Sequence, residues 1–167
     1  MLMAFKHPLQ HRWTFWHLKQ ESNIIWVDKW KEISTVGTVE DFWGVYNWIV
    51  LPSQLQIGSS YGLFKAGVRP DWEDEANAKG GRWVIQSRRQ LDYVWKEIAM
   101  TLVGSSLGVG LDDTVAGAVV NARRAKSNIG VWMMDSSLSD KMEVRLRNVL
   151  KRSDTIEVWN AEYRSHK

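Results

Sequence analysis

Apolar and polar positions alternate with two distinct periods along the chain, and these periods divide it into helices and strands. Three segments repeat apolar residues at the spacing of amphipathic helices, namely 38–52, 87–104 and 139–152. Between them lie short runs rich in aromatic and β-branched residues and bounded by turn residues, which are typical of strands. The expected strands are 11–19, 28–36, 60–67, 80–87, 115–123, 128–134 and 155–164.

Local signals predict the helix ends. Thr38 is a hydroxyl N-cap with two acids in the turn that follows, and Pro52 is expected to end that helix. Gly104 should stop the second helix, and Ser139 should cap the third. Trp48 falls opposite the apolar stripe of the first helix, where it predicts either an extra contact surface or a ring lying over neighbouring loops. The apolar faces contain Val39, Phe42, Trp43, Tyr46, Ile49 and Val50 in the first helix, Leu91, Val94, Trp95, Ile98, Ala99 and Leu102 in the second, and Met142, Leu146, Val149 and Leu150 in the third.

This order of elements predicts an α+β fold built on a curved, mostly antiparallel β-sheet. Three helices would pack on the convex face of the sheet and leave the ligand site on its concave side. The segment 105–113 is expected to be a loop. With 44% hydrophobic residues, no internal repeat and no linker, residues 1–167 are expected to form a single domain around one core.

Composition narrows the class of protein. The sequence has no apolar run of about 18 residues and no charged-then-apolar leader, so neither a membrane span nor export is expected. The absence of cysteine excludes disulfides and thiolate metal sites, and the four histidines lack the spacing of metal ligands. We therefore expect no metal and no cofactor, and a cytoplasmic location with the nucleus as the alternative.

Charge and ring content suggest a partner that combines phosphate with an aromatic group. Residues 121–152 contain eight Lys and Arg against three acids, whereas 71–75 contains four acids. A net charge of +3 favours a polyanion only weakly by itself. Eleven tryptophans accompany four phenylalanines and four tyrosines. Because a core does not require tryptophan, we expect some of these rings to be used for their flat faces.

Trp72 and Glu73 together suggest a reader of a cationic base. A tryptophan face attracts a cationic ring by roughly 0.5–2 kcal/mol, and Trp26 in another loop could complete a sandwich. The Glu73 carboxylate can accept two hydrogen bonds from the N1–H and 2-amino group of guanine, and methylation at N7 makes guanine cationic. Arg123, on the same strand face as Asn121, could hold the attached phosphates. Taken singly, each feature has a plainer explanation. Trp26 alone is more simply a ring that fills the core or covers it, by about three to one. The acids at 71–75 alone would be a solvated turn or the start of a helix, and Arg123 and Arg124 alone a solvated strand end.

Four longer segments, taken with their order and spacing, favour the binding-site interpretation over these plainer ones. The segments are HPLQHRWTFW (7–16), TVEDFWGVYN (38–47), LFKAGVRPDWEDEANAKGGRW (63–83) and GAVVNAR (117–123). Together they resemble the mRNA cap-binding translation initiation factor 4E family, and the similarity runs from His7 to His166. Both ends are brief relative to that family and are expected to be trimmed.

The resemblance implies how the methylated base would be bound. Trp26 and Trp72 match the family's two stacking tryptophans, and Glu73 matches the carboxylate that reads the guanine edge. The backbone N–H of Trp72 would donate to O6 of the base. Trp132 corresponds to the ring that contacts the N7-methyl group.

The resemblance also assigns the phosphate side of the site. Arg82 and Arg123 match basic residues near the phosphates, and Asn121 lies beside them. Arg124 and Lys126 continue the basic segment. The family's lysines fall here on Ala125 and Asn128, so the binding of the phosphates is expected to be rearranged.

A second surface would bind a protein. His7, Pro8, Val39, Trp43 and Gly104 match the family's dorsal surface, which receives a helix of the Y-x-x-x-x-L-Φ type. The helix comes from the initiation scaffold (4G type) or from a 4E-binding repressor. Lys96 replaces an apolar residue common on that surface.

The implied function is binding without catalysis, in which the protein recognises the 7-methylguanosine 5′ cap of mRNA and recruits a translation initiation scaffold. The alternative is a cap-binding translational repressor or specialised paralogue that recruits a different partner, and Lys96 keeps it open. An enzyme acting on the cap would need a metal–carboxylate cluster or a cofactor loop beside the base. A carbohydrate binder would show neither a preference for a charged purine nor a salt dependence.

Overall fold

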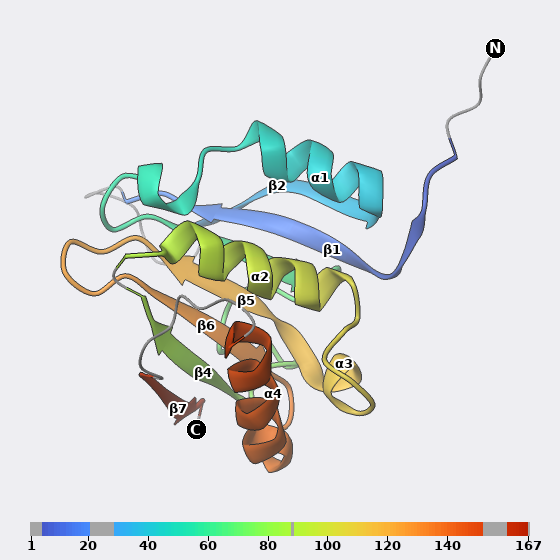
Figure 1. Ribbon diagram of the computed structural model, residues 1–167, viewed down its shortest axis with the longest axis vertical. Coiled ribbons are helices and arrows are strands. Elements are labelled where there is room, and N and C mark those ends of the chain that lie inside the picture. Colours follow the sequence, from blue (N-terminus) through green and yellow to red (C-terminus); the bar gives the residue numbers. More distant parts are fainter. Residues whose placement is uncertain (1–4, 21–28, 88, 152–159, 167) are drawn as a thin grey trace.

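A computed structural model describes residues 5–20, 29–87, 89–151 and 160–166 (Figure 1). The strands are β1 (Pro8–Leu18), β2 (Trp30–Thr38), β3 (Ser60–Lys65), β4 (Gly81–Gln86), β5 (Val115–Asn121), β6 (Asn128–Met133) and β7 (Ala161–Ser165). The helices are α1 (Val39–Trp48), α2 (Leu91–Val103), α3 (Leu111–Thr114) and α4 (Ser139–Lys151), with short 3₁₀ turns η2 (Pro52–Gln54) and η3 (Ser136–Leu138). Part of the last predicted strand, 155–159, lies outside the described residues.

The seven strands form one sheet in the order β2-β1-β3-β5-β6-β4-β7. Every pairing is antiparallel. The three long helices α1, α2 and α4 lie on one face of this curved sheet, as Figure 1 shows. The predicted α+β fold is therefore confirmed, and the other face of the sheet carries no helix in the described chain.

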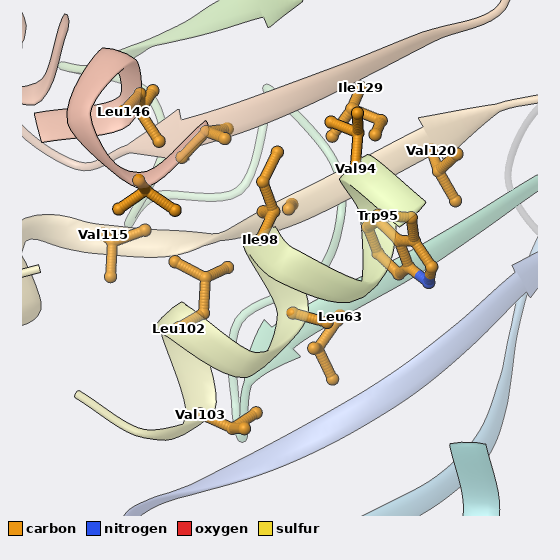
Figure 2. Packing of buried hydrophobic residues seen from close by; sticks show 14 of the residues in the cluster. Leu63, Val94, Trp95, Ile98, Leu102, Val103, Val115, Val120, Ile129 and Leu146 are labelled. Carbon is orange, nitrogen blue, oxygen red and sulfur yellow. The ribbon is translucent and has the colours of Figure 1, made fainter. Parts of the chain in front are cut away.

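The main core lies between the helices and the sheet. All six apolar positions predicted for α2, and all four predicted for α4, are buried. Figure 2 shows Trp95 and Ile98 of α2 packed over Leu63, Val120 and Ile129 of the strands. Each such aliphatic side chain stabilises the fold by about 1.5–3 kcal/mol, so this layer fixes the sheet that carries the functional site.

The start of α1 and the end of α2 follow the predicted signals. The hydroxyl of Thr38 accepts a hydrogen bond from the Asp41 backbone N–H at 3.1 Å, which confirms the N-cap. Gly104 ends α2, and its N–H donates to the Met100 carbonyl at 2.9 Å. Helix α1 ends earlier than predicted, at Trp48, and Pro52 begins η2 instead of ending α1.

Three further expectations were wrong. The segment predicted as a loop at 105–113 contains the start of α3, where Asp112 accepts hydrogen bonds from the N–H groups of Leu107 and Gly108 and so folds the turn. Ser139 is the first residue of α4 and does not precede it as a cap, because η3 leads directly into this helix; the Asp135 carboxylate caps η3 by accepting from the Ser137 N–H. Val50 is exposed because the helix ends before reaching it.

The Trp48 ring is 80% exposed, so it does not lie over neighbouring described loops. The extra contact surface that this residue suggested stays a prediction. Within the described ranges, the helices are all too short or too polar to cross a membrane.

Candidate functional site

The face of the sheet opposite the helices carries the candidate site. Alternation along β5 sends Ala118 and Val120 into the main core and turns Val119 and Asn121 the other way. The same alternation places Trp132 of β6 on this second face. A smaller apolar cluster supports it and consists of Trp16, Phe64, Ala116, Val119 and Trp132, with Trp30, Val68 and Met134 packed against it.

A hollow of about 380 Å³ lies over this cluster. Strands β2, β4, β5, β6 and β7 and the loop after β3 contribute to its walls. It therefore has an apolar floor with polar and cationic groups around it. The lining residues are Trp30, Pro70, Trp72, Arg82, Val84, Val119, Asn121, Arg123, Asn128, Gly130, Trp132 and Arg164.

The loop that carries Trp72 is folded by its own acids. The Asp71 carboxylate accepts from the Glu73 backbone N–H at 2.9 Å. The Asp74 carboxylate accepts from the N–H groups of Arg69 at 3.1 Å and Ala76 at 2.9 Å. Two of the four clustered acids thus satisfy loop backbone donors, which explains why a basic chain keeps carboxylates here.

A buried asparagine completes the loop. Asn77 is fully buried, and its amide donates to the backbone carbonyls of Arg69 at 3.0 Å and Asp71 at 2.9 Å. His166 Nδ1 donates to the Asn77 carbonyl at 2.9 Å, and the His166 ring lies 4.6 Å from the Trp132 ring. Burial, opposed by this hydrogen bond, lowers the pKa of His166. The Trp72 loop is therefore tied to the floor of the hollow, a role for Asn77 that the sequence analysis missed.

The structure describes some of the predicted base-binding residues and not others. The Trp72 ring is 54% exposed and borders the hollow. Glu73 is exposed beside it, and its carboxylate has no partner within the described chain. Trp26 lies outside the described residues. Trp30, which the sequence analysis did not select, lines the hollow from β2.

Trp132 and two arginines form a row across β6, β4 and β7. Arg82 is paired with Trp132 on one side and Arg164 on the other. The Arg82 guanidinium carbon lies 5.5 Å from the centre of the Trp132 ring. Burial, and secondarily the charge of Arg164, lowers the pKa of Arg82. Two neighbouring cations repel each other, so the row favours an anion between them. Arg164 was not among the predicted site residues. Its guanidinium also donates to the nearby Glu162 carboxylate.

Arg123 is held at the edge of the hollow where β5 ends. Its guanidinium donates to the Ala122 carbonyl at 3.0 Å and lies 3.4 Å from the Asn121 Oδ1. The Asn121 amide in turn donates to Asn128 Oδ1 at 2.9 Å. Burial lowers the pKa of Arg123. Arg124 and Lys126 are exposed on the loop beyond and do not line the hollow.

The predicted partner-binding residues lie on the helical face. The Val39 N–H donates to the His7 carbonyl at 2.9 Å, and Pro8 is paired with Thr38. Two hydrogen bonds from His7, the side-chain bond being the larger cause, lower the pKa of Glu40 to about 2. These contacts fix the N-terminal segment against the start of α1.

Trp43 and Gly104 extend this surface. The Trp43 ring is half-buried against the core, 5.0 Å from the Phe42 ring. Gly104 ends α2 at the same end of the molecule as the start of α1 (Figure 1). The Lys96 ammonium lies 6.0 Å from the centre of the Trp43 ring. The structure thus places His7 and Pro8 beside the start of α1, which carries Val39 and Trp43, and Gly104 at the end of α2.

The arrangement can bind a flat cationic ring and an attached anion. Trp72 presents an exposed ring and Glu73 a carboxylate without a partner among the described residues, while Arg82 and Arg123 supply positive charge around the hollow. Arg164 also lines the hollow, but its charge is paired with that of Glu162. Groups of three or more His, Cys, Asp or Glu that could hold a metal do not occur among the described residues.

Comparison with known proteins shows which family the chain is similar to. Residues 8–167 match the family model of eukaryotic initiation factor 4E. Eukaryotic translation initiation factor 4E1 of Drosophila melanogaster is 40% identical over 154 residues, which are 88% of this chain and 59% of that protein. The complex of Ascaris suum eIF4E-3 with m2,2,7G cap has a TM-score of 0.86 at 38% identity and covers 98% of this chain and 93% of that one. The complex of C. elegans eIF4E-3 with the 4E-binding protein Mextli and cap analog has a TM-score of 0.87 at 40% identity, and the match covers 97% of this chain and 94% of that one.

These matches extend over nearly the whole chain. The chain itself spans about three fifths of the length of the Drosophila relative, 59%. With a family model covering residues 8–167 and a relative 40% identical over most of the sequence, the chain belongs to the eukaryotic initiation factor 4E family.

Proposed function

We propose that this chain binds the 7-methylguanosine 5′ cap of mRNA in the hollow and recruits a translation initiation scaffold on its helical face. The observation that carries the proposal is the convergence of the half-exposed Trp72 ring with Arg82, Arg123 and Trp132 around one hollow. The cap complexes of the Ascaris and C. elegans relatives support it. The role is binding without catalysis, with the cytoplasm as its place of action.

The base end of the cap is bound by rings and one carboxylate. The Trp72 face stacks on the cationic base, with Trp26 as the second ring, and Trp132 contacts the N7-methyl group. Glu73 accepts from the N1–H and 2-amino donors, because its carboxylate is not used by the loop. The stacking contribution is about 0.5–2 kcal/mol per cationic contact.

The phosphates are bound by the arginines. Arg82 on β4 and Arg123 after β5 both line the hollow, and both guanidinium groups are partly desolvated, which strengthens their attraction for phosphate. Asn121 holds Arg123 in place. Arg124 and Lys126 act at longer range from the exposed loop.

A protein partner docks on the helical face. His7, Pro8, Val39, Trp43 and Gly104 form its binding surface, and the partner contributes a helix of the Y-x-x-x-x-L-Φ type from a 4G-type scaffold or a 4E-binding repressor. The C. elegans relative in complex with the 4E-binding protein Mextli supports this part of the proposal.

One observation favours a second candidate function, that of a cap-binding repressor or specialised paralogue. The Lys96 ammonium lies 6.0 Å from the Trp43 ring centre and places a positive charge on the partner surface. A partner segment with an acid facing this position would be preferred over a wholly apolar one.

Titration of the purified chain with 7-methyl-GTP and with GTP tests the proposal. We expect tight binding of the methylated nucleotide only, and a loss of about tenfold or more for Trp72→Ala. Trp48→Ala is the matched control, because that ring is also exposed but lies on α1. Equal binding of the two nucleotides, or equal effects of the two substitutions, would overturn the proposal.

A further inference from the structure

A buried hydroxyl group lies beside the residues at the phosphate end of the candidate cap site. It belongs to Ser60, which begins β3 and is 2% exposed. The strand register pairs Ser60 with Asn121, the last residue of β5, so the two side chains are neighbours on the same face of the sheet. Asn121 lines the hollow and Ser60 does not. Ser60 is therefore close to the binding surface without being part of it.

Ser60 begins a continuous series of side-chain hydrogen bonds. Its hydroxyl donates to Asn121 Oδ1 at 2.6 Å, and the Asn121 amide nitrogen donates to Asn128 Oδ1 at 2.9 Å. The Asn128 amide nitrogen donates in turn to the Lys126 carbonyl at 3.2 Å. Because both ends of the Asn121 amide have a partner, the amide is fixed in one orientation, with its oxygen toward Ser60 and its nitrogen toward Asn128.

The same amide oxygen faces Arg123. Arg123 Nη2 lies 3.4 Å from Asn121 Oδ1. Nη1 donates to the carbonyls of Ala122 at 3.0 Å and Ser59 at 3.5 Å. These acceptors hold the guanidinium where β3 begins and β5 ends, and they leave its Nε donor without a partner among the described residues. A reversed Asn121 amide would present N–H groups to Arg123 in place of an acceptor and would release Nη2.

We propose that Ser60 is a positioning residue for the phosphates of the cap and acts through Asn121 on Arg123. Its hydroxyl fixes the Asn121 amide oxygen, and that oxygen holds the Arg123 guanidinium with Nε left to donate to a phosphate oxygen. Ser60 itself touches no ligand. This inference rests on the proposed cap-binding function. It adds a residue outside the hollow that sets how strongly the phosphates are held.

Titration with 7-methylguanosine and with 7-methyl-GTP tests this role, since only the triphosphate reaches Arg123. We expect Ser60→Ala to lower the affinity for 7-methyl-GTP about three- to tenfold, the effect of one hydrogen bond, and to leave the affinity for the nucleoside unchanged. Ser60→Cys keeps the bulk of the side chain but is only a weak donor, so it should show the same loss even where Ser60→Ala does not fold. Equal losses for the two ligands would overturn the inference.

A double-mutant cycle shows whether Ser60 acts through Arg123. In an Arg123→Ala background, Ser60→Ala should cause no further loss of affinity for 7-methyl-GTP, because the group that Ser60 positions is gone. Additive losses from the two substitutions would overturn the inference. Thr14→Val is the matched control, since it removes another buried strand hydroxyl, which lies 2.8 Å from the Thr35 hydroxyl and does not line the hollow. This control should leave the affinity for both ligands unchanged.

NMR of the arginine Nε–H groups in the free chain, recorded at slightly acidic pH, needs no ligand. We expect Ser60→Ala to shift the Arg123 signal and to leave the signal of Arg147, on α4, unchanged. An unshifted Arg123 signal would overturn the positioning role of Ser60. Failure of the wild-type chain to bind 7-methyl-GTP would instead overturn the proposed function, and the Arg123 signal would still decide whether Ser60 positions this arginine.

Discussion

Replacing Asn77 with alanine should weaken binding of 7-methyl-GTP, although Asn77 does not line the hollow. The substitution removes the two hydrogen bonds from its amide to the carbonyls of Arg69 and Asp71, at 3.0 and 2.9 Å. Each such bond contributes about 0.5–1.5 kcal/mol, so the folded loop should lose about 1–3 kcal/mol. The loop that carries Trp72 would then be ordered for a smaller fraction of the time.

The loss of order should appear as a loss of affinity, because the apparent Kd rises in inverse proportion to the binding-competent fraction. At about 1.4 kcal/mol for each factor of ten, we expect a Kd about tenfold higher for Asn77→Ala. Calorimetric titration measures the Kd, and amide hydrogen exchange of residues 68–80 measures the loop. Asn47→Ala, at an exposed position of α1, is the control and should change neither. Wild-type affinity together with wild-type exchange in Asn77→Ala would refute the anchoring role of this residue.

Four other substitutions have expected outcomes. Glu73→Gln should lower affinity for 7-methyl-GTP about tenfold or more without changing the melting temperature, whereas Glu75→Gln should leave the affinity unchanged. Equal affinities of the two variants in titration would contradict recognition of the guanine edge by Glu73. Arg123→Ala should weaken binding of the triphosphate more than that of the nucleoside, and equal losses would contradict its phosphate role. Trp43→Ala should abolish binding of a Y-x-x-x-x-L-Φ peptide, and a simultaneous loss of cap affinity would indicate a core role instead. Because hydrogen bonds from His7 lower the Glu40 pKa to about 2, its stabilisation is present above the ordinary value of 4.5 and is lost as the pH falls toward 2. Glu40→Gln should flatten this part of the stability profile in denaturant unfolding, and an unchanged profile would contradict it.

The fold could be predicted largely from the sequence because its helices obey a local rule. The positions of Val94, Ile98 and Leu102 repeat at helical spacing, and burial of these side chains fixes α2 on the sheet. Cap residues such as Thr38 also act through their immediate neighbours. The start of α3 was not predicted, because its turn is folded by hydrogen bonds from the Leu107 and Gly108 N–H groups to the Asp112 carboxylate. Such a turn shows no periodic apolar pattern in the sequence.

The site could be predicted only in part because its geometry depends on register and on loop hydrogen bonds. Trp72 and Glu73 are adjacent in the sequence and were recognised together. Arg164 reaches the hollow only because β7 pairs with β4 and places it beside Arg82, which no local pattern encodes. Asn77 was missed for a similar reason, since its two acceptors are backbone carbonyls that become neighbours only after the loop closes.

The central claim is that a methylated cap nucleotide occupies the hollow between Trp72 and the arginine row. Two-dimensional NMR of the tryptophan indole N–H groups, recorded during titration with 7-methyl-GTP, tests this most directly. We expect large shifts for the Trp72 and Trp132 signals, with those of the buried Trp95 and the distant, exposed Trp48 unchanged. Unchanged Trp72 and Trp132 signals at saturating nucleotide, or shifts centred on Trp48, would contradict it.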